Sequence, residues 1–228
     1  MTSQFISQDA QRAFDVLRDG GIAIIPMDVG YTAAGGSGAA LQKIFDAKQR
    51  GPTKLNAMCA DNEIAFDVYQ LSERAKTIIK VITEDYDLPL GAIAPCQMDH
   101  PLLQVLDERA VSASTKNATL VMLLNAGPFH REICRLSREH GHPIFGSSAN
   151  ISMSGTKFRV EDIEPEITNI ADLIIDHGLR KFHHYRESST LLNIETLEVV
   201  RHGSCFELIA DIMKRRFNIE LPARIRHE

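Results

Sequence analysis

The sequence has few cysteines, and none of them stand at metal-binding spacing. The four cysteines are scattered along 228 residues and form no C-x-x-C pair. Zinc sites and the disulfide frames of secreted proteins both need closely spaced or paired cysteines. The histidine pairs His183-His184 and His140-x-His142 lack a third ligand at zinc spacing. We therefore expect reduced, structural thiols and no metal site formed by the protein.

Long apolar runs are also absent. No segment approaches the roughly 20 apolar residues of a membrane-spanning helix, and the N-terminus lacks the apolar centre of a signal peptide. We expect a cytoplasmic protein with no membrane partner. A net charge of −5 argues against a surface coated with basic side chains for nucleic-acid binding, although it allows a local basic cleft.

What the chain does contain is an alternation of apolar strands and amphipathic helices, with 44% hydrophobic residues to fill a core. The clearest segments are an apolar strand at residues 119–124 and helices at 128–140 and 206–217. The pattern predicts an α/β fold with a twisted, mixed parallel and antiparallel sheet flanked by helices. No repeat or linker divides the chain, so we expect a single domain at residues 1–217 and a tail at 218–228.

Residues 27–37 are rich in glycine and alanine and directly follow a short apolar strand at residues 22–25. Small residues of this kind let a ligand approach the backbone closely. We interpret the segment as a loop that carries Asp28 and Tyr31 toward a ligand.

A second polar segment follows the apolar residues 143–145. Its hydroxyl, amide and backbone N–H groups are donors suited to an anion, as in phosphate-binding loops. Gly155, at its exit, and Gly203, near the end of the chain, are expected to adopt positive φ. The polar side chains of the segment are Ser147, Ser148, Asn150, Ser152 and Ser154.

A basic cluster stands where the helix predicted at residues 38–50 ends. It consists of Lys48 and Arg50, followed by Lys54. A charged last turn is common because the helix dipole favours cations there. Lysine as a point charge and arginine as a two-pronged donor are nevertheless the groups that phosphoryl and nucleotidyl transfer require.

The order of these segments resembles the YrdC-like family, best known for the threonylcarbamoyl-adenylate synthases of tRNA modification. The resemblance runs from about residue 8 to about residue 204. It is carried by the K-x-R pair Lys48 and Arg50 with the lysine Lys54, the S-A-N-x-S loop from Ser148 through Asn150 to Ser152, the S-T motif at Ser189-Thr190, and the R-x-G motif at Arg201 and Gly203.

The resemblance implies a sheet folded around a deep, positively lined cavity. It also implies a reaction in which a carbamate, formed from an amino acid and bicarbonate, attacks the α-phosphate of ATP. The products are a carbamoyl-adenylate and pyrophosphate, and Mg²⁺ assists. The implied ligands are thus ATP, Mg²⁺ and a small amino-acid or carbamate substrate, with RNA as a further partner.

The resemblance also implies residue roles. Catalysis is assigned to Lys48, Arg50, Ser148 and Asn150. Nucleotide binding involves these four residues together with Lys54, Ser152, Ser189 and Arg201. The substrate is expected near Met27, Asp28, Tyr31 and Leu123.

Several positions depart from the family pattern. Met27 stands where the family has a threonine, Leu123 where it has an arginine, and Asn193 where the S-T-x-x-D motif has its aspartate. The segment Leu88-Pro-Leu-Gly91 lacks the threonine of the family's P-G-P-x-T. Because an unpaired buried carboxylate is costly, Met27 and Leu123 predict an altered acceptor pocket in which threonine is not the preferred substrate.

Two other functions remain open on the sequence. One is a catalytically inactive protein that binds nucleotide or double-stranded RNA in the same cavity. The other is a carbamoyl transferase component of a specialised small-molecule pathway. Pyrophosphate release separates an enzyme from a binding protein.

Overall fold

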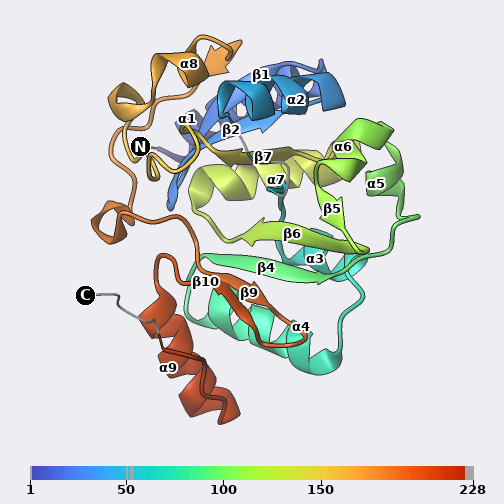
Figure 1. Cartoon of the computed structure of the whole chain (residues 1–228), viewed down its shortest axis with the longest axis vertical. Coiled ribbons are helices and arrows are strands. Elements are labelled where there is room, and N and C mark those ends of the chain that lie inside the picture. Colours follow the sequence, from blue (N-terminus) through green and yellow to red (C-terminus); the bar gives the residue numbers. More distant parts are fainter. Residues whose placement is uncertain (1, 50, 52–53, 224–228) are drawn as a thin grey trace.

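The computed structural model describes residues 2–49, 51 and 54–223. Figure 1 shows one continuous twisted sheet with helices packed around it. Along the sheet the strands follow the order β10-β9-β4-β6-β3-β7-β2-β1-β8, and β5 pairs with β6 outside this path. The strands are β1 (Ile22–Met27), β2 (Gly30–Gly35), β3 (Ala57–Cys59), β4 (Leu90–Pro95), β5 (Thr115–Lys116), β6 (Thr119–Leu124), β7 (Phe145–Ser148), β8 (Leu173–Ile174), β9 (Leu191–Asn193) and β10 (Val199–Arg201).

Parallel and antiparallel pairs are mixed. The β1–β2, β2–β7 and β4–β6 pairs are antiparallel, whereas β3–β6 and β4–β9 are parallel. This confirms the α/β fold class predicted from the sequence.

The helices lie against both ends of the sheet. In Figure 1, α1, α2 and α8 surround the β1–β2 end, and α3, α4 and α9 surround the β4–β9–β10 end. The helical segments are α1 (Ser3–Arg18), α2 (Gly38–Ala47), α3 (Asn62–Val68), α4 (Glu73–Lys80), α5 (Pro101–Gln104), α6 (Glu108–Ser112), α7 (Pro128–His140), α8 (Pro165–Thr168) and α9 (Phe206–Phe217), with a π-helical turn at Val81–Asp85 and 3₁₀ turns at Val160–Asp162 and His183–Tyr185. Within the described residues no helix has the length and apolar character needed to cross a membrane.

Local chemistry explains where these helices begin. The side chains of Ser37, Asp61 and Ser72 each accept a hydrogen bond from a backbone N–H in the first turn of α2, α3 and α4, which satisfies a donor that the helix leaves unpaired. Helix α7 begins with a proline at its first position and ends at Gly141 in the left-handed region, so its bounds agree with those predicted.

The reading of residues 27–37 as a loop is wrong. They contain the turn and the second strand of a hairpin, in which β1 extends to Met27 and β2 covers Gly30–Gly35. Their small side chains are needed because other backbone packs against them: a Cβ on Gly36 would lie 1.5 Å from the carbonyl oxygen of Leu17. Small residues here therefore mark a strand packed closely on a helix.

The expectation of positive φ holds for Gly155, which has φ of +85°, but not for Gly203. At Gly203 the constraint is space, since a Cβ would lie 2.3 Å from the carbonyl oxygen of Ser188. Glycine at this position lets two backbone segments touch beside β9 and β10.

Candidate active site

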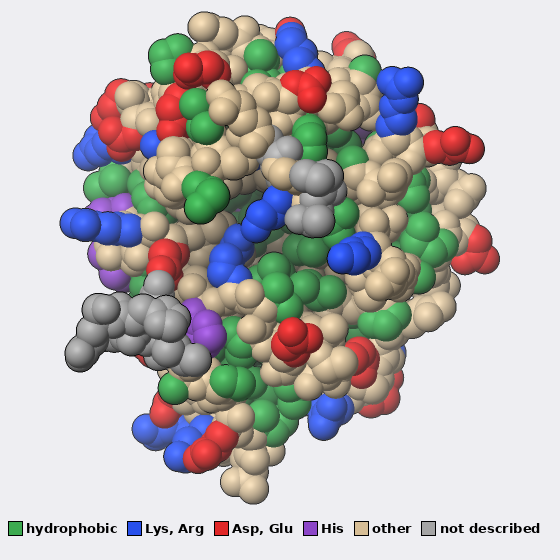
Figure 2. All heavy atoms as spheres, in the orientation of Figure 1, with side chains coloured by type: hydrophobic (Ala, Val, Ile, Leu, Met, Phe, Trp, Pro, Cys, Tyr) green, Lys and Arg blue, Asp and Glu red, His purple; other side chains and the backbone are tan. Residues whose placement is uncertain are grey.

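A cavity of about 560 Å³ opens on one face of the sheet. Figure 2 shows this face hollowed near its centre, with hydrophobic side chains inside and Lys and Arg side chains at the margin. Strands β3, β6, β4 and β9 supply most of the floor, which is apolar. The floor side chains are Ala57, Cys59, Ile93, Val121, Leu123 and Leu191.

The alternation of side chains along β6 explains why the cavity floor is hydrophobic but only partly buried. In β6, Leu120 and Met122 are fully buried against the helices, while Val121 and Leu123 are only partly buried and line the cavity. Since successive side chains of a strand point to opposite faces, β6 contributes one face to the core and the other to the cavity.

The walls of the cavity are polar and positively charged. Among the described residues that line it, the charged ones are Lys54 and Arg201, and none is a carboxylate. Arg201 donates from Nε and Nη2 to the carbonyl oxygen of Ser189, at 3.1 and 2.8 Å. Partial desolvation lowers the pKa of Arg201, but an arginine remains charged at neutral pH. The walls therefore suit an anion.

Two strand ends add hydroxyl groups to these walls. Thr32 of β2 is paired with Ser148 of β7, and Ser147 precedes it. The Oγ atom of Ser147 is buried and has no hydrogen-bond partner among the described residues. Since neighbouring side chains of a strand point to opposite faces, Ser148, which is paired with the cavity-lining Thr32, presents its hydroxyl to the cavity, whereas the Ser147 hydroxyl does not.

The structure brings together the two polar clusters found in the sequence. Lys48 is 3% exposed and donates from Nζ to the carbonyl oxygens of Ser148 and Asn150, the latter at 2.6 Å. The backbone N–H of Ser152 donates to the carbonyl oxygen of Lys48 at 2.9 Å. The end of α2 is thereby bonded to the loop that follows β7. Arg50 lies outside the described residues.

The remaining polar residue of this loop, Asn150, is buried. Its Nδ2 donates to the carbonyl oxygen of Ile151 at 2.5 Å, and its Oδ1 has no partner within the described part of the chain. Among the other predicted nucleotide contacts, Ser148, Ser189, Lys54 and Arg201 line the cavity, whereas Ser152 is not among its lining residues.

The residues predicted to face the substrate are divided between three environments. Leu123 lies in the cavity floor and Tyr31 in its wall. The hydroxyl of Tyr31, however, accepts from the His177 N–H at 3.1 Å and lies 3.0 Å from Asp176 Oδ1. Met27 is fully buried in the hydrophobic core. None of these placements tests the predicted roles, but Met27 is separated from any ligand in the cavity.

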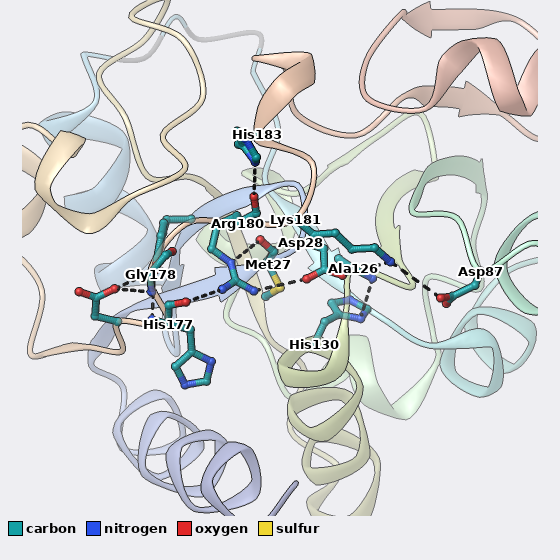
Figure 3. A network of polar contacts seen from close by, with 12 residues as sticks. Met27, Asp28, Asp87, Ala126, His130, His177, Gly178, Arg180, Lys181 and His183 are labelled. Atoms are coloured by element: carbon teal, nitrogen blue, oxygen red, sulfur yellow. Dashed lines mark hydrogen bonds and ion pairs between the residues drawn. The ribbon is translucent and has the colours of Figure 1, made fainter. Parts of the chain in front are cut away.

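Asp28 faces a different hollow, which we call the charged cleft. It is lined by Asp28, Asp87, Arg131, Arg180 and Lys181 together with apolar side chains. Figure 3 shows Asp28 between Arg180 and Lys181. The distance from Arg180 Nη2 to Asp28 Oδ1 is 3.3 Å, and Lys181 Nζ lies 4.0 Å from Asp28 Oδ2. Burial raises the pKa of Asp28, and the positive charge of Arg180 opposes that shift.

Sequence reasoning does not identify Arg180, whose guanidinium is the centre of these contacts. Arg180 also donates to the carbonyl oxygens of Met27 and His177, at 3.1 and 3.0 Å. It is separated from Asp28 by 152 positions, and no local pattern connects the two residues. Thr32 was missed because residues 27–37 were interpreted as a loop.

Comparison with known proteins agrees with this architecture. The model of a family described as Telomere recombination, the Sua5/YciO/YrdC domain, matches residues 15–203. The chain belongs to the Sua5/YciO/YrdC family. The match covers all of the strands and ends where Gly203 packs on Ser188.

Solved structures of the Sua5/YciO/YrdC fold superpose on most of the chain. A hypothetical protein of Streptococcus mutans, smu.1377c, has a TM-score of 0.76 at 20% identity, over 92% of this chain and 93% of that one. E. coli YciO has a TM-score of 0.65 at 21% identity, over 89% and 90%. P. abyssi Sua5, whose structure contains L-threonine, has a TM-score of 0.72 at 18% identity, over 95% of this chain but 59% of that one.

Proposed function

We propose that this protein is an ATP-dependent nucleotidyltransferase that forms a carbamoyl-adenylate from a carbamate and ATP and releases pyrophosphate. Membership of the Sua5/YciO/YrdC family supports this class of activity. The observation that carries the proposal is the cavity itself, which has cationic and hydroxyl-bearing walls and no carboxylate among its described lining residues.

In the proposed reaction a carboxylate oxygen of the carbamate attacks the α-phosphorus of ATP. The bond from that phosphorus to the bridging oxygen breaks, and pyrophosphate leaves with the bonding electrons. Such transfers are catalysed mainly by positioning and by stabilisation of the shifting charge. Arg201 and Lys54 supply positive charge, and the Thr32 and Ser148 hydroxyls supply neutral donors. The reaction requires no general base, because the carbamate is already an anion.

Protein-bound Mg²⁺ is usually held by one or two carboxylates and by substrate phosphates, and the described lining residues include no carboxylate. The cavity therefore does not suit a metal held by protein ligands, and Mg²⁺ would enter it on the phosphates of the nucleotide. Hydroxyls of the wall, such as those of Thr32 and Ser148, could complete its coordination. Bound Mg²⁺ would neutralise charge on the phosphates.

The acceptor pocket is the part in which we propose a departure from threonine. Leu123, Val121 and Ile93 form an apolar floor, and none of these side chains can hold a free carboxylate. The loss of one charged hydrogen bond costs about 1.5–3 kcal/mol, or roughly ten- to a hundredfold in affinity. We therefore expect threonine to be used poorly and an acceptor with an apolar group over the floor to be preferred.

The test is pyrophosphate release from ATP, bicarbonate and Mg²⁺ with a panel of amino acids and other amines, with the adenylate identified by mass. The expected result is release with an apolar acceptor and little with threonine. Saturable turnover at submillimolar threonine would refute the altered pocket. Binding of ATP with no release for any acceptor would instead indicate a nucleotide-binding protein without this activity.

A further inference from the structure

Lys48, at the end of α2, is buried, whereas the lysine and the arginine that line the cavity are not enclosed in this way. Lys54 and Arg201 line its walls, but Lys48 is not among the described lining residues. Lys48 is 3% exposed, and its Nζ points to main-chain oxygens on both sides of Ala149. An ammonium group is buried at this depth only where hydrogen bonds compensate for the water it loses.

The bonds around Lys48 fix the loop that follows β7 from two directions. Lys48 holds the carbonyl oxygens of Ser148 and Asn150 and, through its own carbonyl oxygen, the N–H of Ser152. From the other direction, the N–H of Ala149 donates to the carbonyl oxygen of Tyr31 in β2 at 2.8 Å. These bonds hold the carbonyl oxygens of Ser148 and Asn150 to one ammonium and so restrict the backbone between them.

That arrangement bears on where one hydroxyl group of the wall stands. Ser148, the last residue of β7, is the first residue of the bonded segment and lines the cavity. A loop with few such bonds samples several conformations, and each ordered residue costs about 1–2 kcal/mol in backbone entropy. A wall that is ordered before the ligand arrives avoids this cost on binding.

We propose that Lys48 is a positioning residue: it holds the segment from Ser148 to Ser152 in the geometry that binds the nucleotide and does not itself contact the phosphates. The effect on nucleotide binding rests on the proposed function. The effect of Lys48 on the order of the loop can be measured without any nucleotide. The positioning role differs from a role as a point charge on the triphosphate, which the residue type alone suggests.

The first experiment is hydrogen–deuterium exchange of the free protein. In Lys48→Met, the amides of residues 149–152 should exchange roughly tenfold faster or more, the factor that corresponds to about 1.4 kcal/mol of lost protection. Lys54→Met is the matched control, because it removes the same charge from the cavity wall without a contact to this loop, and it should leave these amides unchanged. Equal exchange in Lys48→Met and the wild type would overturn the proposal. If Lys48→Met does not fold, Lys48→Gln, which keeps a donor, replaces it.

The second experiment separates positioning from direct charge contact. Attraction between a partly exposed side chain and a phosphate weakens as salt screens it. ATP affinity should fall about tenfold or more in Lys48→Met, because charged hydrogen bonds that order the loop are lost. The salt dependence of ATP binding should remain that of the wild type. In Lys54→Met the salt dependence should decrease. A decreased salt dependence in Lys48→Met would show a direct phosphate contact and contradict the proposal.

The two measurements also distinguish this inference from the proposed function. If the wild type binds no ATP, the proposed function fails, and hydrogen exchange still decides whether Lys48 orders the loop. If ATP binds and the loop is equally protected in Lys48→Met, the positioning role fails while the proposed function remains.

Discussion

The cavity and the charged cleft are both lined by residues of the β1–β2 hairpin, yet their charged groups are arranged in opposite ways. In the cleft, cations and carboxylates face each other, and Asp28 contacts Arg180 at 3.3 Å. In the cavity, Lys54 and Arg201 face no carboxylate among the described lining residues. Opposite charges in contact hold the fold together, whereas a wall that carries cations and no carboxylate suits an anionic ligand.

This comparison predicts a large loss of stability when the cleft is disrupted. Arg180→Met should lower the free energy of unfolding by about 3–5 kcal/mol, because it removes the nearer of the two cations beside the buried Asp28 carboxylate and leaves only Lys181, at 4.0 Å. Urea denaturation measures the effect. Arg135→Met is the control: Arg135 makes exposed ion pairs along α7, and its loss should cost about 1 kcal/mol or less. Equal effects of the two substitutions would show that the cleft contributes nothing special to stability.

Two glycines near the cavity allow its backbone geometry to be tested in the same way. Gly203→Ala should cost about 1–3 kcal/mol, as overpacking does, because its Cβ would lie within 2.4 Å of the Ser188 and Ser189 backbone. Gly155→Ala meets open space and bears only the strain of a positive φ, about 1 kcal/mol. Thermal unfolding compares the two variants. A larger loss for Gly155→Ala would contradict the close packing at Gly203.

The loop beyond Asn150 should confer stability that depends on pH. Burial would raise the pKa of Glu164, but hydrogen bonds from Lys157 and Ser154, at 2.8 and 2.6 Å, hold it at about 2. A lowered pKa in the folded state means that the contribution is present above pH 4.5, the ordinary value, and is lost as the pH falls toward 2.

Glu164→Gln should therefore destabilise the protein by about 1–2 kcal/mol at pH 6, and the difference from the wild type should shrink as the pH falls below 4.5. Urea unfolding at several pH values measures this difference. The matched control is Glu161→Gln, since Glu161 makes only an exposed contact with Arg159. A difference that did not change between pH 6 and pH 2.5 would show that Glu164 is not held as a carboxylate by these bonds.

The parts of the fold that sequence predicts well are those determined by local patterns. Helix α7 and strand β6 have the predicted bounds, because periodicity and end-capping residues lie within the segments themselves. Strand β2 was missed because its residues Gly-Tyr-Thr-Ala-Ala-Gly have the composition of a loop. What makes them a strand is the close approach of α1 and the pairing with β7, which the segment alone does not encode.

The candidate site follows the same rule. The polar loop at residues 147–152 and the cations Lys54 and Arg201 could be identified from residue type and order. Lys48 was also identified, but its burial and its bonds to main-chain oxygens depend on how α2 meets the loop. The placement of Asp28 in the charged cleft depends on Arg180, 152 positions away. Tertiary contacts of this kind decide which polar residues face a ligand and which face each other.

Calorimetric titration of ATP into the wild type, Arg201→Met and Arg131→Met tests most directly whether the cavity, and not the cleft, is the binding site. Both arginines are exposed side chains, one in the cavity wall and the other in the charged cleft. We predict that ATP binds the wild type and Arg131→Met with equal affinity and binds Arg201→Met about ten- to a hundredfold more weakly. Unchanged affinity in Arg201→Met, or a loss confined to Arg131→Met, would contradict the assignment of the nucleotide to the cavity.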